Sequence, residues 1–310
     1  MRHFNCVVIV GATATGKTAL AVKLARAKNG EIISADSRQV YRGLDLGTGK
    51  DLQEYGEIPY HLIDVCDLDR EFTVFHFQQE VYRSLPQLLK KGALPVIAGG
   101  TGLYLDAILR GYELIPVPEN PVLRKELAGK TLEELQTVLL ALKSDIHNTT
   151  DLQQPCRLIR AIEIARYRQE HPECAAVYRQ KAPVFVPKVY GIFFERSVLR
   201  ERIYRRLLTR IDAGMIEETE RIHAQGYSWE RLEGLGLEYR FTAQYLQGKI
   251  QTKEAYIAQL YRAICRFAKR QETWFRRMIK NGIEIDWIDG KDAERLQAET
   301  VSASERFSCL

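Results

Sequence analysis

The chain has 310 residues and a formal net charge of +5, from 45 Lys and Arg against 40 Asp and Glu. Hydrophobic residues make up 45% of it and charged residues 27%, a globular composition that excludes disordered, collagen-like, coiled-coil and disulfide-scaffold chains. No apolar stretch approaches the roughly 20 residues of a spanning helix, which excludes a membrane protein. The length predicts about two domains, at roughly 100–200 residues each.

The six cysteines are scattered and show no C-x-x-C spacing. The first residues run into an apolar segment too short for the core of a signal peptide. We therefore expect reduced thiols in a cytoplasmic protein, with neither a disulfide framework nor metal bound by cysteine.

The first predicted element is a short buried strand, Phe4–Val10, followed by a helix that runs to Ala27. The turn between them matches the phosphate-binding loop G-x-x-x-x-G-K-[ST]. Glycines there let backbone N–H groups converge on a phosphate, and the helix adds its positive end. The pattern predicts pyrophosphate binding by Gly11, Ala12, Thr13, Ala14, Thr15, Gly16, Lys17 and Thr18, with a Mg²⁺ ligand in the Thr18 hydroxyl.

Three further strands are predicted at Ile32–Ser34, Leu94–Ala98 and Val189–Phe194. Strands that alternate with glycine turns and helices indicate an α/β fold with a parallel sheet. Asp36 and Thr101 follow two of these strands, so we expect both at the edge where the phosphate loop opens. By residue type alone, a lone Asp such as Asp36 is more often a helix cap or a turn former, and Thr101 is by default a turn hydroxyl. Tyr60–Asp64 faintly resembles a Walker B strand with Asp64 as a metal ligand, although its apolar run is short.

Residues 115–187 contain proline-flanked, helix-forming stretches without a strong strand. We predict a helical insertion domain over 115–187, carried by a core of residues 1–114 and 188–310.

Two helical stretches concentrate positive charge, with a net +5 over residues 196–210 and +6 over residues 260–280. Such runs are often solvated helix faces. Here Arg202, Arg206 and Arg210 recur every four residues on one face, and Trp274 and Phe275 interleave with the later cations. Basic and aromatic side chains mixed in this way favour nucleic-acid binding.

Six blocks in order give the sequence a resemblance to the tRNA dimethylallyltransferase family along nearly its whole length. The blocks are GATATGKT at 11–18, ADSRQVYRGLDLGTGK at 35–50, PYHLIDV at 59–65, GGTGLYLDAIL at 99–109, the Asp151-x-x-x-Pro155-x-Arg157-x-x-Arg160-Ala161-x-Glu163 block, and AKRQETWFRR at 268–277.

The resemblance implies a P-loop NTPase-like core with a central parallel sheet flanked by helices, plus the all-helical insertion. It also implies Mg²⁺-dependent transfer of a dimethylallyl group from dimethylallyl diphosphate to N6 of adenosine-37, immediately 3′ of a tRNA anticodon. Asp36 then matches the catalytic carboxylate, and Arg206 the arginine that grips the diphosphate, with Lys17, Thr18 and Thr101 around the leaving oxygen.

The same resemblance implies tRNA contacts, to the anticodon stem-loop, from six parts of the chain. The residues are Asp36, Ser37, Arg38, Gln39, Thr101, Arg124, Cys156, Arg157, Leu158, Ile159, Arg160, Leu235, Gly236, Leu237, Glu238, Tyr239, Arg240, Lys269, Arg270, Gln271, Trp274 and Arg276.

Two departures from the family pattern stand out. Glu238 occupies the place of a family glycine, and Arg166–Glu170 replaces a Thr-Gly-Lys segment. We expect both to face RNA, away from the phosphate loop, and to affect the choice of tRNA more than the reaction.

Three alternatives remain: transfer to a free adenine nucleotide, a small-molecule P-loop kinase, and a tRNA-binding paralogue without turnover. The basic surface argues against the first two, and the intact motifs against the third. We expect a monomer that needs no protein partner.

Overall fold

The computed structural model describes residues 4–142, 153–174 and 183–298. The chain divides into two compact units, a core unit of residues 1–111 and 183–310 and an insertion unit of residues 112–182. The boundaries fall a few residues before the predicted 115 and 187, because Pro187 already opens a strand of the central sheet.

The core unit is built on a six-stranded sheet with the order β3-β2-β4-β1-β5-β6. All of its strand pairs are parallel. The strands are β1 (Cys6–Gly11), β2 (Gly30–Ser34), β3 (Tyr60–His61), β4 (Leu94–Gly99), β5 (Pro187–Phe193) and β6 (Asp286–Asp289). The four predicted strands are confirmed, with ends shifted by one or two residues.

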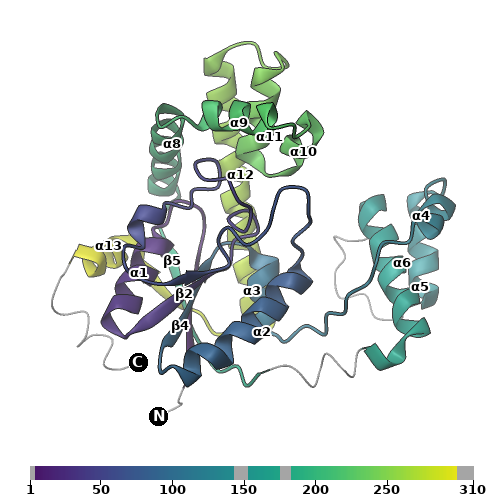
Figure 1. Ribbon diagram of the computed structural model, residues 1–310, viewed down its shortest axis with the longest axis horizontal. Helices are drawn as coiled ribbons and strands as arrows, with labels where there is room; N and C mark the ends of the chain where they lie inside the picture. The colour runs from purple at the N-terminus through teal and green to yellow at the C-terminus, as the bar shows by residue number, and fades with distance from the viewer. Residues whose placement is uncertain (1–3, 143–152, 175–182, 299–310) are drawn as a thin grey trace. The chain divides into compact units, whose positions relative to one another are not determined.

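Helices surround this sheet (Figure 1). In the core unit they are α1 (Lys17–Ala27), α2 (Val74–Lys90), α3 (Gly102–Leu109), α8 (Arg196–Asp212), α9 (Met215–Ala224), α10 (Trp229–Gly234), α11 (Leu237–Leu246), α12 (Lys253–Lys280) and α13 (Gly290–Ala298), with a 3₁₀ turn, η1 (Leu52–Glu54). Within the described ranges, no helix is long and apolar enough to cross a membrane.

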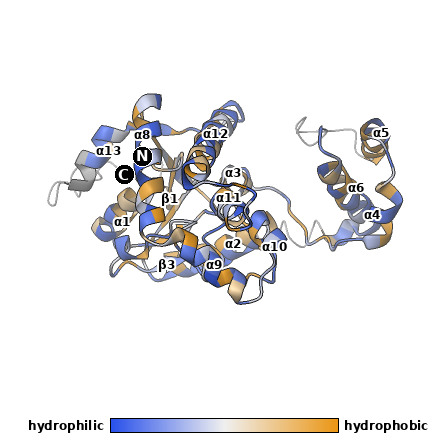
Figure 2. Cartoon of the chain, turned by 90° about the horizontal axis from the view of Figure 1, so that it is seen from above, coloured by the Kyte–Doolittle hydropathy of each residue, from blue (hydrophilic) through white to orange (hydrophobic). Residues whose placement is uncertain are grey.

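The two faces of the sheet bury different clusters, because successive strand side chains point to opposite sides. Val7 and Ile9 of β1 pack with α1, α8 and α12 on one face. Val8 and Val10 pack with α2 and α3 on the other. Figure 2 shows the apolar colour along β1, while the surrounding helices carry both colours.

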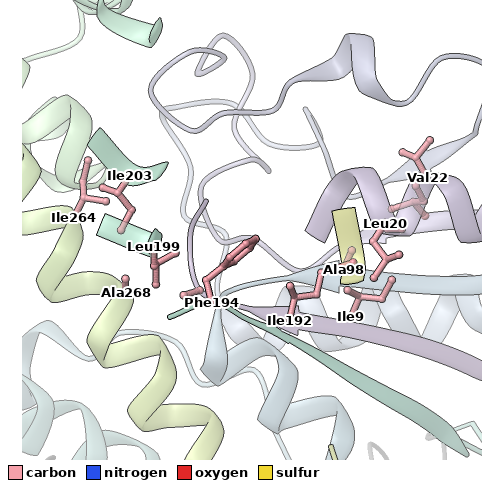
Figure 3. Packing of buried hydrophobic residues seen from close by; sticks show 14 of the residues in the cluster. Ile9, Leu20, Val22, Ala98, Ile192, Phe194, Leu199, Ile203, Ile264 and Ala268 are labelled. Carbon is pink, nitrogen blue, oxygen red and sulfur yellow. The ribbon is translucent and has the colours of Figure 1, made fainter. Parts of the chain in front are cut away.

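Helices α8 and α12 pack on each other and on the first face of the sheet. In Figure 3, Ile203 of α8 lies beside Ile264 of α12, and Leu199 lies near Ala268, with Phe194 between them and the strands. Toward its end α12 contributes Phe275 to the cluster on the other face. Helix α12 therefore contributes side chains to the clusters on both faces of the sheet.

The described part of the insertion unit contains α4 (Pro121–Leu127), α5 (Leu132–Leu142) and α6 (Pro155–Glu170). Leucines from all three helices form a core of their own, with Leu127, Leu158 and Ile162 fully buried. The prediction of helices in this segment is confirmed for the described residues.

Candidate active site

Three predicted segments meet at one edge of the sheet. The phosphate loop follows β1, Asp36 lies two residues beyond β2, and Thr101 lies two residues beyond β4. The strands end together, since Val10 pairs with Gly99 and Ser34 pairs with Ala98. Carboxyl ends of neighbouring parallel strands form the crevice in which ligands of such folds bind.

The phosphate loop is held open by its own hydrogen bonds. Gly16, which precedes α1, and Ala14 both have left-handed backbone, with φ of 80° and 63°. The hydroxyl of Thr15 donates to the Ala12 carbonyl at 2.9 Å, and Nζ of Lys17 donates to the same oxygen at 2.7 Å. The loop therefore wraps the N-terminus of α1, where backbone N–H groups favour an anion.

The pKa of Lys17 in the phosphate loop is strongly lowered. Burial of its ammonium and repulsion from Arg206 lower its pKa to about 7, although Asp36 opposes the shift. The same influences place Arg206 and Asp36 within electrostatic range of Lys17. A bound anion would reverse this shift, because it stabilises the charged amine.

A cavity of about 330 Å³ opens beside the loop. Its wall combines loop residues, two carboxylates and three arginines of α8: Ala14, Gly16, Lys17, Thr18, Asp51, Glu54, Arg202, Arg205 and Arg206. Nε of Arg202 also donates to the Ala14 carbonyl at 2.8 Å, which ties α8 to the loop. The predicted arginine face of α8 thus lies against the phosphate loop.

Asp51 pairs with Arg206 and with a further arginine of α8, Arg210. Its Oδ2 lies 2.6 Å from Nη2 of Arg206 and 3.5 Å from Nη2 of Arg210. Burial and the neighbouring Arg206 lower the pKa of Arg210 to about 10. Gly49, with φ of +60°, lies beneath this cluster, and a Cβ there would overlap the Arg210 guanidinium.

Asp36 and Thr101 are connected through the backbone. Oδ1 of Asp36 accepts a hydrogen bond from the N–H of Arg38 at 2.8 Å, which shapes the turn after β2. The hydroxyl of Thr101 accepts from the N–H of Ser37 at 3.0 Å, and its own N–H donates to the Ala35 carbonyl at 3.2 Å. Both side chains are half-buried at the same strand ends.

The loop between Asp36 and Asp51 has a polar frame. Gln39 is buried, and its amide donates to the Gly49 carbonyl at 3.0 Å. Lys50 is 1% exposed and binds Asp45 at 2.7 Å together with Asp64. Asp64, the weak Walker B candidate, therefore neutralises a buried lysine.

Sequence reasoning missed Glu218 of α9. Its buried carboxylate accepts from three backbone N–H groups of the loop, at 3.2, 2.8 and 3.1 Å, and from the Tyr239 hydroxyl at 2.6 Å. Burial and this carboxylate raise the pKa of Tyr239. Glu218 thus holds the loop that carries Asp51.

Residues 235–240 were predicted to contact tRNA. Leu235 and Tyr239 are 1% exposed and belong to the packing between α9, α10 and α11. Gly236 precedes α11 and has φ of 136°, Leu237 packs against the core, and exposed Arg240 donates to the Glu233 carbonyl.

The expectation that Glu238 lies away from the phosphate loop is wrong. It lines a small cavity together with Thr13 and Ala14 of the loop and Arg206 and Arg210 of α8. Burial raises the pKa of Glu238, although Arg210 opposes the shift. Glu238 stands in the first turn of α11, so this turn lies beside the phosphate loop and the arginines of α8.

The residues of α12 divide between two faces. Lys269, Arg270 and Arg276 are exposed, whereas Gln271 is buried and Trp274 is half-buried. A cleft of about 360 Å³ separates the outer face from α8. Six cations and one carboxylate line it: Arg196, Arg200, Arg262, Arg266, Lys269, Arg276 and Glu272.

In the insertion unit, the predicted tRNA contacts surround one buried carboxylate. Glu163 accepts from Nε of Arg124 at 2.8 Å, Nη1 of Arg160 at 2.9 Å and the N–H of Asn120 at 2.9 Å. These partners lower its pKa to about 2 against the opposing effect of burial. Elsewhere on α6, Cys156 and Arg157 are exposed, Ile159 is half-buried and Leu158 belongs to the core.

Comparison with known proteins decides the family. A model described as IPP transferase matches residues 39–278, and one described as isopentenyl transferase matches residues 4–57. The chain belongs to the IPP transferase family. "tRNA dimethylallyltransferase 2" of Treponema denticola is 60% identical over 284 residues, which cover 92% of this chain and 95% of the relative. The tRNA dimethylallyltransferase of Treponema pallidum is 58% identical over 288 residues, which cover 92% and 91%.

Solved structures agree with this IPP transferase assignment. The tRNA isopentenylpyrophosphate transferase of Bacillus halodurans matches with a TM-score of 0.67 and 31% identity, over 99% of this chain and 98% of that chain. A eukaryotic dimethylallyltransferase acting on tRNA matches with a TM-score of 0.75 over 99% and 79% of the two chains, at 20% identity, and shows the fold alone. The predicted P-loop-like fold and transferase class are confirmed.

Proposed function

We propose that this chain is a tRNA dimethylallyltransferase, which transfers a dimethylallyl group from dimethylallyl diphosphate to N6 of adenosine-37 in tRNA and releases diphosphate. The observation that carries the proposal is the meeting of a phosphate loop, an arginine cluster and the Asp36–Thr101 turn at one edge of the sheet. The relatives named above are tRNA dimethylallyltransferases or tRNA isopentenyltransferases, and they support the same reaction.

The donor fits the cavity beside the phosphate loop. Loop N–H groups, Lys17 and Arg206 would bind the diphosphate, with Arg206 exchanging Asp51 for a phosphate oxygen. When the allylic C–O bond breaks, its electron pair leaves on the diphosphate oxygen. Prepositioned cations stabilise that charge without having to reorganise.

Oxygen donors at this cavity fit Mg²⁺, which prefers hydroxyl, carboxylate and phosphate oxygens. The Thr18 hydroxyl, which hydrogen-bonds Tyr55, would hold the ion together with the diphosphate, and the carboxylates of Asp51 and Glu54 line the same cavity. When bound, the ion neutralises part of the negative charge on the leaving diphosphate.

Asp36 would act on the acceptor. The adenine amine is a poor nucleophile because its lone pair is delocalised into the ring. A carboxylate that accepts a hydrogen bond from N6 raises its electron density and takes the proton as the new N–C bond forms. The turn that presents Asp36 is fixed by Arg38 and, through Ser37, by Thr101, so the carboxylate is held at one place on the sheet edge.

Transfer to tRNA is favoured over transfer to a free nucleotide by the α8–α12 cleft. Six cations against Glu272 make a surface suited to several phosphates, and a mononucleotide does not need it. Flipping the target base costs a few kcal/mol, which backbone contacts of this kind offset. A kinase reaction loses support, because Asp64 is bound to Lys50. Action on tRNA also favours the cytoplasm as its location.

The test is nucleoside mass spectrometry after incubation with Mg²⁺, dimethylallyl diphosphate and either unmodified tRNA or AMP. We expect isopentenyladenosine in the tRNA digest, and product in the AMP reaction alone would refute the proposal.

The variant Asp36→Asn keeps the oxygen that caps Arg38 but removes the charge. We expect a loss of about 10²–10⁴-fold in turnover, the usual range for a general base, with tRNA affinity near wild type by filter binding. Retained turnover in Asp36→Asn would contradict the role of Asp36.

A further inference from the structure

We propose that Gln271 is a positioning residue that ties the phosphate loop to the Thr101 turn, so that one amide aligns the donor site with the acceptor site. The proposal rests on the function proposed above. It gives Gln271 a role different from the direct tRNA contact implied by family resemblance.

The amide of Gln271 spans two loops. Its Oε1 accepts from the N–H of Thr13 in the phosphate loop at 2.9 Å, and its Nε2 donates to the Gly100 carbonyl at 2.8 Å. The residue is 6% exposed, so both ends of the amide are enclosed by protein. An amide can serve both partners at once because it carries a donor and an acceptor side by side.

The glycines around Thr101 show how closely α12 approaches this turn. A Cβ at Gly100 would overlap Nε2 of Gln271, and a Cβ at Gly102 would overlap the Trp274 indole. Residues 271 and 274 are three apart and share one face of α12. That face therefore lies against the turn on both sides of Thr101.

Thr101 connects the turn held by Gln271 to Asp36, the residue that would act on the acceptor adenine. Its hydroxyl accepts the N–H of Ser37, the residue directly after Asp36. The phosphate loop, Thr101 and Asp36 are thus connected through protein contacts in which Gln271 provides the link to the loop. Losing that amide would release the Thr13 N–H and the Gly100 carbonyl together, and a misplacement of about 1 Å between reactants can cost about 100-fold in rate.

The opposite face of the same helix has a different character. Lys269 and Arg276 are exposed and line the basic cleft. A direct RNA contact and a positioning contact therefore lie on separate faces of one helical segment, which makes the two roles separable by mutation.

The test uses full-length Gln271→Met, which preserves side-chain length and removes both hydrogen bonds. We expect Kd for inorganic diphosphate, measured by calorimetry with Mg²⁺, to rise about tenfold, as for one lost hydrogen bond to a buried group. We expect kcat to fall by a further tenfold or more, and Kd for tRNA to stay within about twofold of wild type.

Gly100→Ala provides an independent variant, since its Cβ pushes the amide away while Gln271 stays intact. We expect the same pattern, a weaker diphosphate complex with unchanged tRNA affinity. Lys269→Gln, two residues from Gln271 on the exposed face, is the matched control. It should weaken tRNA binding and reduce its salt dependence while the diphosphate Kd stays constant.

Two results would overturn the proposal: a raised tRNA Kd with unchanged diphosphate Kd in Gln271→Met, or unchanged constants in both Gln271→Met and Gly100→Ala. If one variant fails to fold, as judged by circular dichroism, the other decides. The diphosphate measurement needs no turnover, so the inference can be tested even if wild-type protein fails to prenylate tRNA, which would refute the proposed function alone.

Discussion

Donor binding above neutral pH should take up a proton, because Lys17 is largely uncharged in the donor-free protein. Burial and Arg206 hold its pKa at about 7, against a usual value of 10.5. A diphosphate beside the amine supplies the opposite charge and returns the pKa toward that value. Lys17 therefore changes its protonation as the donor enters.

The size of the effect follows from the two pKa values. At pH 8 a group with a pKa of about 7 is charged in about one molecule in ten, so binding takes up about 0.9 proton. At pH 6 Lys17 is charged in about nine molecules in ten, so the uptake falls to about 0.1 proton. Above pH 7 donor affinity should fall by up to about tenfold per pH unit.

The pH dependence of folding stability has the same sign as for a carboxylate whose pKa folding lowers, and the opposite sign to that of a lysine whose pKa folding raises. The pKa of Lys17 in the folded protein is below that of the unfolded chain, so between about pH 7 and pH 10.5 the unfolded chain binds more protons. The free protein should therefore gain stability as pH rises through this window. In the empty site the charged form of Lys17 lowers the free energy of unfolding, and a bound diphosphate compensates for this loss.

Isothermal titration calorimetry with dimethylallyl diphosphate and Mg²⁺ measures the uptake directly. Two buffers with different ionisation enthalpies at pH 8 should give different heats, and the difference gives the number of protons. Lys17→Arg is the matched control, because its side chain stays charged and its heats should not depend on the buffer. Buffer-independent heats for the wild type at pH 8 would refute the reasoning.

Two further variants test the frame of each unit. Glu163→Gln should destabilise α4 and α6 by up to about 3 kcal/mol, which corresponds to a pKa lowered from 4.5 to about 2. In the wild type this contribution is present above pH 4.5 and is lost as pH falls toward 2. In Glu163→Gln the opening free energy of these helices, obtained from hydrogen exchange after correction for the intrinsic pH dependence of the exchange rate, should lack this contribution over that range. Gly49→Ala should cost about 1–2 kcal/mol for left-handed backbone alone. It should also raise the donor KM, because the Cβ would displace Arg206 together with Arg210. An unchanged melting temperature and KM would show that the site accommodates a methyl group.

The strand-end residues could be placed from sequence because parallel strands have a simple geometric rule. Once three buried strands were identified, two of them followed by glycine turns, their carboxyl ends had to meet at one edge. The phosphate loop, Asp36 and Thr101 were therefore predicted together and lie there together. The rule needs only local patterns, and such patterns are strong in buried strands.

Glu218 and β6 could not be found in this way. Glu218 accepts hydrogen bonds from backbone groups more than 170 residues earlier in the chain, and no local pattern marks a carboxylate for such a role. The strand Asp286–Asp289 is a short edge strand with only two apolar residues, Trp287 and Ile288. It lacks the apolar run that identifies the central strands.

The division of α12 into a buried face and an exposed basic face can be read from the spacing of its residues. Ala268, Gln271, Phe275 and Met278 follow one another at intervals of three and four residues and are all buried. That spacing defines one helix face, so Gln271 belongs with the core residues in this series. The neighbouring cations indicate RNA binding, and they do not distinguish inward-facing Gln271 from the exposed residues beside it.

The glycines in these sequence blocks also allow close packing between distant parts of the chain. Each of several glycines is needed because a side chain from the C-terminal half of the core unit packs where its Cβ would stand: Gly47 against Tyr239, Gly49 against Arg210, Gly100 against Gln271 and Gly102 against Trp274. Blocks that are far apart in sequence are therefore complementary surfaces in the fold. A phosphate loop alone would indicate only an anion, whereas the joint presence of these blocks specifies how α8, α11 and α12 close on the strand ends, and that closure places the donor cations beside the Asp36 turn.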